Sequence, residues 1–89
     1  MKSSSGNEYP KAINTKSKRA LYDNLGSNEQ LALAIDGVVK EYRYDGWRGN
    51  RFKERVIRNH IKQALERFDI TDEREIEKVM NLVRNQDEY

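Results

Sequence analysis

The sequence predicts an all-α fold, a small bundle of about four helices joined by short loops. Apolar residues recur every three or four positions through most of the chain, and no segment alternates as a strand would. Polar residues that can cap a helix precede these segments. The 89 residues leave room for one small domain. We expect this domain over residues 8–89, after a disordered leader or an expression remnant over residues 1–7.

The first two helices are expected over residues 16–25 and 29–44. Thr15 and Asn28 are their expected N-caps, and Gly26 ends the first one. The first has a small apolar face with Ala20, Leu21 and Leu25, and the second has a longer one with Leu31, Ala34, Ile35, Val38, Val39 and Tyr42.

Leu33 and Gly37 lie on the opposite side of the second helix. Glycine inside a helix costs about 1 kcal/mol relative to alanine. A leucine above such a glycine therefore predicts that another backbone approaches there, either the first helix or a partner.

The last two helices are expected over residues 51–68 and 72–86, with Asn50 and Thr71 as N-caps. His60 lies on the apolar face of the third helix and is expected to be a hydrogen-bonded core residue. That face comprises Phe52, Val56, Ile57, Ile61, Ala64, Leu65 and Phe68. The fourth helix has a narrower stripe of Ile76, Val79, Met80 and Val83, and residues 87–89 are expected to be an exposed end.

The segment from Asp45 to Asn50 holds the only Trp and two of the five Gly. Glycines on both sides of Trp47 and Arg48 give the backbone positive-φ freedom, which suits a turn between two helices. Trp47 can then be a core residue that fills the turn. Alternatively, Trp47 and Arg48 form a recognition patch, because Trp and Arg are enriched at interface hot spots.

A basic ridge runs along the third helix, formed by Arg51, Arg55, Arg58 and Lys62. The formal net charge is only +2, yet residues 40–67 carry nine Lys or Arg against four acidic residues, and residues 68–89 carry three against seven. The ridge predicts contact with nucleic acid or with an acidic protein surface. The alternative is a solvated face, partly neutralised by Glu54 and Glu66 at helical spacing from Arg58 and Lys62.

Catalytic chemistry is not expected of this chain. It contains no Gly-x-x-x-x-Gly-Lys loop, no Lys preceded two residues earlier by an acidic residue, and no Cys. One His and no Cys provide no ordinary zinc site, and Ser residues confined to the first third make a poor triad. No apolar run reaches the roughly 18 residues of a membrane span, so a cytoplasmic protein without a membrane partner is expected.

Several separated segments resemble the extreme C-terminus of the R subunit of type I restriction endonucleases. They are residues 8–10, 15–26, 45–50, 53–55 and 83–89. The positions that match the family pattern are Arg19, Tyr22, Asp23, Asn24, Trp47, Arg48, Asn50, Lys53 and Glu54.

This resemblance implies a large cytoplasmic parent, in which a metal-dependent nuclease and an ATP-driven DNA translocase precede a helical C-terminal region. ATP and Mg belong to those upstream domains, so this part has no cofactor of its own. The helical region is expected to assemble with the M and S subunits of the methyltransferase core and with the rest of the R subunit.

Three functions are consistent with this sequence. The leading one is an assembly domain that binds through Trp47, Arg48 and the face of Leu33 and Gly37. The second is direct contact of the basic ridge with DNA. The third is a purely structural cap on the motor.

Overall fold

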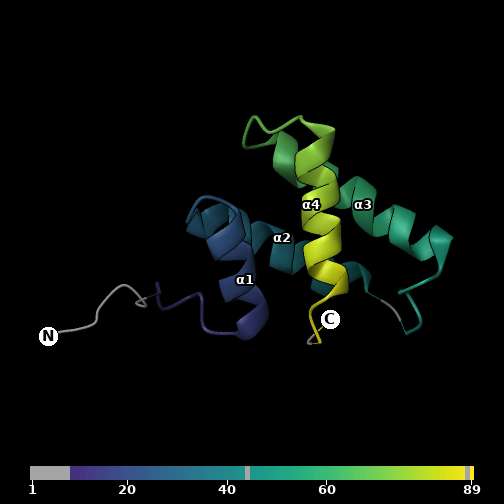
Figure 1. The fold of residues 1–89 in the computed structure, drawn as a ribbon, viewed down its shortest axis with the longest axis horizontal. Helices are drawn as coiled ribbons and strands as arrows, with labels where there is room; N and C mark the ends of the chain where they lie inside the picture. The colour runs from purple at the N-terminus through teal and green to yellow at the C-terminus, as the bar shows by residue number, and fades with distance from the viewer. Residues whose placement is uncertain (1–8, 44, 88) are drawn as a thin grey trace, which may run out of the picture.

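The computed structural model describes residues 9–43, 45–87 and 89, so the expected leader over residues 1–7 lies outside the described residues. The described part is all-α and contains no strand, as the sequence predicted. Its helices follow one another in the order α1 (Lys16–Asn24), α2 (Glu29–Tyr42), α3 (Arg51–Glu66) and α4 (Glu73–Arg84) (Figure 1).

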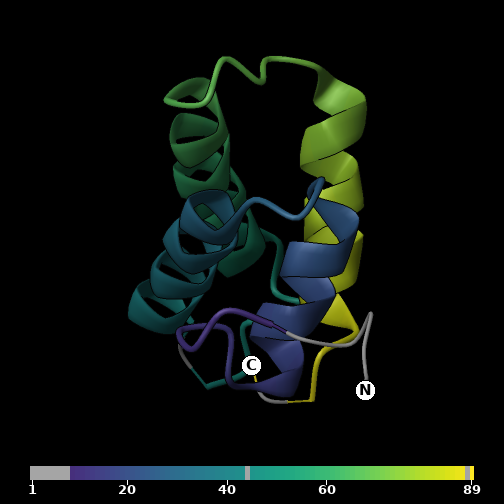
Figure 2. The same cartoon turned by 90° about the vertical axis from the view of Figure 1, so that its left-hand side faces the viewer.

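The helices form a closed ring in which each packs against its neighbours along the chain. α1 contacts α2, α2 contacts α3, α3 contacts α4, and α4 returns to contact α1. Figure 2 shows α2 and α3 on one side of the bundle and α1 and α4 on the other. The final helix therefore covers core residues contributed by the first.

Side-chain caps set the start of each helix. Thr15 accepts a hydrogen bond from the Lys18 amide, Asn28 accepts one from the Leu31 amide, and Asn50 accepts two at the start of α3. The predicted cap Thr71 is wrong by one residue, because Asp72 caps α4 through the Arg74 amide. Either side chain can accept from a helix amide, and the carboxylate also favours the positive end of the helix dipole.

The core lies inside the ring and is mostly aliphatic. Its largest fully buried side chains include those of Leu21, Leu31, Ile35, Ile57, Ile61, Leu65, Ile76 and Met80. Two expected core residues of α3 are instead exposed, Phe52 at 80% and Val56 at 36%. α3 has more apolar residues than one buried face can hold, because its two neighbours cover only part of its circumference.

The expected approach of another backbone to Gly37 is not observed. A Cβ atom built on Gly37 meets no atom within 4 Å, Gly37 is exposed, and Leu33 is half-buried. Because α1 packs on another side of α2, this glycine faces open space. Tyr44, the expected last residue of this helix, lies outside the described residues, and α2 ends at Tyr42.

Candidate functional site

The turn between α2 and α3 places Trp47 in the core. Gly46 and Gly49 adopt positive φ angles of 73° and 80°, a conformation that glycine adopts without a Cβ clash. Trp47 is 4% exposed and belongs to the same hydrophobic cluster as the aliphatic core. The structure therefore agrees with the first interpretation, in which Trp47 is a core residue. The indole ring is buried and does not form an exposed recognition patch.

The indole Nε1 atom of Trp47 is buried and has no hydrogen-bond partner among the residues that the structure describes. Buried indole N–H groups usually find an acceptor, and an unpaired one costs about 1–3 kcal/mol. The Trp47 ring is thus held by its packing in the hydrophobic core and by the guanidinium of Arg48.

Arg48 is exposed and links the turn to the end of the chain. Its guanidinium carbon lies 5.2 Å from the centroid of the Trp47 ring, and its Nη2 atom donates to the backbone carbonyl of Gln86. One side chain thereby covers the indole and binds the segment that follows α4.

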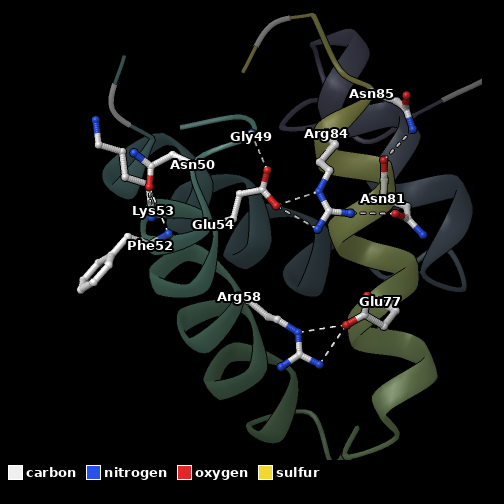
Figure 3. Close-up of polar contacts among 10 residues, drawn as sticks. All are labelled: Gly49, Asn50, Phe52, Lys53, Glu54, Arg58, Glu77, Asn81, Arg84 and Asn85. Carbon is white, nitrogen blue, oxygen red and sulfur yellow. Dashed lines mark hydrogen bonds and ion pairs between the residues drawn. The ribbon is translucent and has the colours of Figure 1, made fainter. Parts of the chain in front are cut away.

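Glu54 joins the turn, α3 and α4 (Figure 3). Its Oε2 atom accepts from the Gly49 amide at 2.7 Å, and its Oε1 atom lies 3.0 Å from both Nε and Nη2 of Arg84. The Gly49 amide is the main cause that lowers the pKa of Glu54. Burial opposes this shift, and Arg84 supports it. Lys53 closes the other side of the turn by donating to the Asp45 carbonyl at 2.9 Å.

The basic ridge is divided by an ion pair. Arg58 binds Glu77 of α4, with Nε and Nη2 at 3.0 and 2.9 Å from one carboxylate oxygen (Figure 3). Arg51, Arg55 and Lys62 are exposed and have no carboxylate partner within the described residues. The expected neutralisation of Arg58 by Glu54 is wrong, because Glu54 pairs with Arg84. The expected pairing of Lys62 with Glu66 is likewise not found among these residues.

Phe52 lies beside the unpaired cations on the first turn of α3. Figure 3 shows its ring pointing away from α4 and into solvent. Helical geometry places Phe52, Val56 and His60 in one row at four-residue spacing, next to a second row of Arg51, Arg55 and Asn59. His60 is half-buried and stacks on Tyr42 of α2, with ring centroids 3.8 Å apart. It therefore belongs to the rim of the core rather than to its interior.

Three α1 positions at which the sequence resembles the R-subunit pattern, Arg19, Tyr22 and Asp23, contact Tyr9. The Tyr9 hydroxyl donates to Asp23 at 2.8 Å, its ring meets Tyr22 edge-on at 5.6 Å, and Arg19 lies 5.2 Å from its centroid. The hydrogen bond to Asp23 is the main cause that raises the pKa of Tyr9. Asn24 donates to the Ala20 carbonyl within α1.

Sequence reasoning missed a buried polar contact between Asp36 of α2 and Tyr89. Asp36 is 4% exposed, accepts from the Tyr89 hydroxyl at 2.5 Å, and forms an ion pair with Lys40 at 3.3 Å. Tyr89 itself is 7% exposed, so the expectation of an exposed end is wrong at this residue. An Asp inside an otherwise apolar helical face, four residues before a Lys, is the signal that could have identified this contact.

No cluster of His, Asp or Glu in the described part of the chain could hold a metal ion. Its helices also include none that is long and apolar enough to cross a bilayer.

The described residues form an all-α bundle in which the polar contacts of Glu54 join the turn, α3 and α4. Comparison of the chain with family models, with curated proteins and with solved structures gives no match.

Proposed function

We propose that this domain is a non-catalytic assembly module at the C-terminus of the R subunit of a type I restriction-modification enzyme. In this proposal it docks the R subunit onto the methyltransferase core of M and S subunits in the cytoplasm. Site-specific DNA cleavage and ATP-driven translocation, with their ATP and Mg, belong to upstream domains of the parent.

The observation that carries the proposal is that the segments resembling the R subunit contact one another in the fold. Tyr9 binds Asp23 within the first pair of segments, and Arg48 binds the Gln86 carbonyl between the turn and the last segment. Glu54, in the segment 53–55, binds Arg84 of the last segment. Such mutual contacts are expected of a motif set that defines one folded domain.

The contact surface cannot be the Trp47 ring, because that ring is buried. The exposed residues that follow Trp47 in the chain include Arg48 and, on the first turns of α3, Arg51, Phe52 and Arg55. Gly37, with the half-buried Leu33, provides an open face on α2. Docking through these residues leaves the core intact.

The test is size-exclusion chromatography with light scattering on the domain mixed with the M and S subunits of the same system. Runs at about 0.1 M and about 0.5 M salt differ roughly twofold in screening length. Co-elution at either salt supports the proposal, and co-elution at both indicates a mainly apolar contact. A folded domain that elutes alone at both salts contradicts it and favours the structural cap.

A second candidate function is contact with DNA through α3, which the exposure of Arg51, Arg55 and Lys62 favours. Because Arg58 is paired with Glu77, three cations remain, which corresponds to a slope of about −3 in a plot of log affinity against log salt. Fluorescence anisotropy with a duplex oligonucleotide measures this slope. Unchanged binding after charge reversal at Arg55 would exclude the ridge as the contact.

A further inference from the structure

α3 carries a two-row surface that the bundle covers only at one end, where the half-buried His60 stacks on Tyr42. The first row contains Phe52, Val56 and His60, and the second contains Arg51 and Arg55 followed by Asn59. Eight residues separate the ends of the first row, so it extends about 12 Å along the helix.

We propose that this surface, named the α3 strip, binds a protein partner that presents an apolar groove edged by carboxylates. The inference rests on the proposed assembly function and specifies where the partner docks and what chemistry it offers.

The apolar row supplies the anchor. Phe52 is 80% exposed on the first turn of α3, and Val56, one turn further, is 36% exposed. Two apolar side chains at four-residue spacing on an exposed helix face are the anchors by which a helix enters an apolar groove. The row ends at His60, whose stack on Tyr42 provides a rigid boundary.

The cation row determines the charge of the partner. Arg51 and Arg55 are exposed and have no carboxylate partner within residues 9–43, 45–87 and 89, and Lys62 extends the same edge two turns further. The neighbouring Arg58 and Arg84 differ, because Arg58 forms an ion pair with Glu77 and Arg84 forms one with Glu54. Unpaired guanidinium groups beside an apolar row favour carboxylates at the rim of the groove.

The same residues favour a protein over a nucleic acid. Phe52 could stack on an unpaired base, but a branched aliphatic side chain such as Val56 offers no stacking face. Phosphate binding also does not require the apolar row to be exposed. A protein groove accounts for both rows at once.

The size of the strip limits the affinity it can provide alone. A contact about 12 Å long is smaller than a standard interface, so the strip contributes one part of a larger contact or a weak one. Within such a contact, a central aromatic anchor accounts for a large share of the affinity.

The test uses the domain with the M and S subunits and measures affinity by isothermal titration calorimetry. Phe52→Ala and the double variant Arg51→Glu/Arg55→Glu are each expected to weaken binding at least tenfold. The double variant should lose its effect as salt rises, whereas the Phe52 variant should keep it. Lys11→Glu/Lys16→Glu, which makes the same charge change on exposed residues elsewhere, should bind as the unmodified domain does.

All five substituted side chains, three on the α3 strip and two in the control, are exposed, so circular dichroism should show unchanged folding. If both strip variants bind with wild-type affinity, the α3 strip is not the docking surface, and the proposed assembly function still stands. Absence of wild-type binding would overturn both.

Two further outcomes also decide the inference. If the strip variants instead lose affinity for a single-stranded or duplex oligonucleotide and keep the protein partner, the partner chemistry is wrong. A benzoylphenylalanine crosslinker at Phe52 that reacts with an acidic segment of M or S supports the α3 strip, whereas reaction only within the R subunit contradicts it.

Discussion

Replacement of Trp47 by Ala tests whether the turn between α2 and α3 is part of the core. A buried Trp removes about 150–250 Å² from water, which at about 25 cal/mol per Å² corresponds to about 4–6 kcal/mol as an upper estimate. Measured costs of Trp-to-Ala changes in cores are about 3–5 kcal/mol. Because the indole is 4% exposed, we expect Trp47→Ala to destabilise the domain by this amount.

Such a loss is a large part of the total stability. An 89-residue domain has a free energy of unfolding of about 5–13 kcal/mol at typical values per residue. The variant should therefore show a much lower urea midpoint or be partly unfolded in water. Far-UV circular dichroism is the appropriate signal, because Trp47 is the only Trp and its fluorescence is lost with it.

Trp47→Phe is the matched control for this experiment. Phe keeps most of the apolar contact area and removes an indole N–H that has no acceptor in the described part of the chain. Its cost should therefore be about 1–2 kcal/mol, less than half that of the Ala variant. A loss below about 1 kcal/mol for Trp47→Ala would refute the core assignment, and equal losses for both variants would mean that the indole N–H has a partner.

Three further predictions concern pH, the chain end and the exposed ring. The pKa of Glu54 is lowered mainly by the Gly49 amide, so the ionised carboxylate stabilises the fold above about pH 4.5. This stabilisation is lost as pH falls through the folded pKa. Urea titrations at a series of pH values should show the loss, and Glu54→Gln should flatten this pH dependence. Tyr89→Phe leaves the buried Asp36 carboxylate without its hydroxyl donor and should cost about 1–3 kcal/mol, measured by urea denaturation; an unchanged midpoint would contradict the contact. Phe52→Ser removes a solvent-exposed ring and should change the free energy of unfolding by less than about 0.5 kcal/mol; a larger loss would place the ring in the core.

The helices were predictable because their signals are local. Thr15, Asn28 and Asn50 each cap a helix through an amide two or three residues away, and each precedes an apolar pattern with helical spacing. The predicted last helix began one residue early, since Thr71 and Asp72 are adjacent capping residues and the sequence does not rank them.

The faces of the helices were less predictable, because burial depends on which neighbours pack where. Periodicity placed Phe52 and Val56 with Ile57 and Ile61 in one broad face, whereas the ring covers only the second pair. The exposed pair lies beyond the reach of α2 and α4. Sequence spacing alone does not give the width of a buried face.

The polar contacts were not predictable from helical spacing. Glu54 and Arg58 are suitably spaced on α3, yet each binds a partner on another segment, since ion pairs across the α3–α4 boundary compete with those along one helix. The contact between Asp36 and Tyr89 spans 53 positions. Contacts at such distances follow from topology.

The closure of the ring by α4 has a consequence for folding kinetics. α2 and α3 are neighbours along the chain and pack most extensively, whereas the contact of α4 with α1 joins the two ends of the domain. Because loop closure becomes more costly with sequence separation, α2 and α3 should meet early and α4 should dock late. Substitutions in the contacts of α4 should then speed unfolding and leave the refolding rate nearly unchanged.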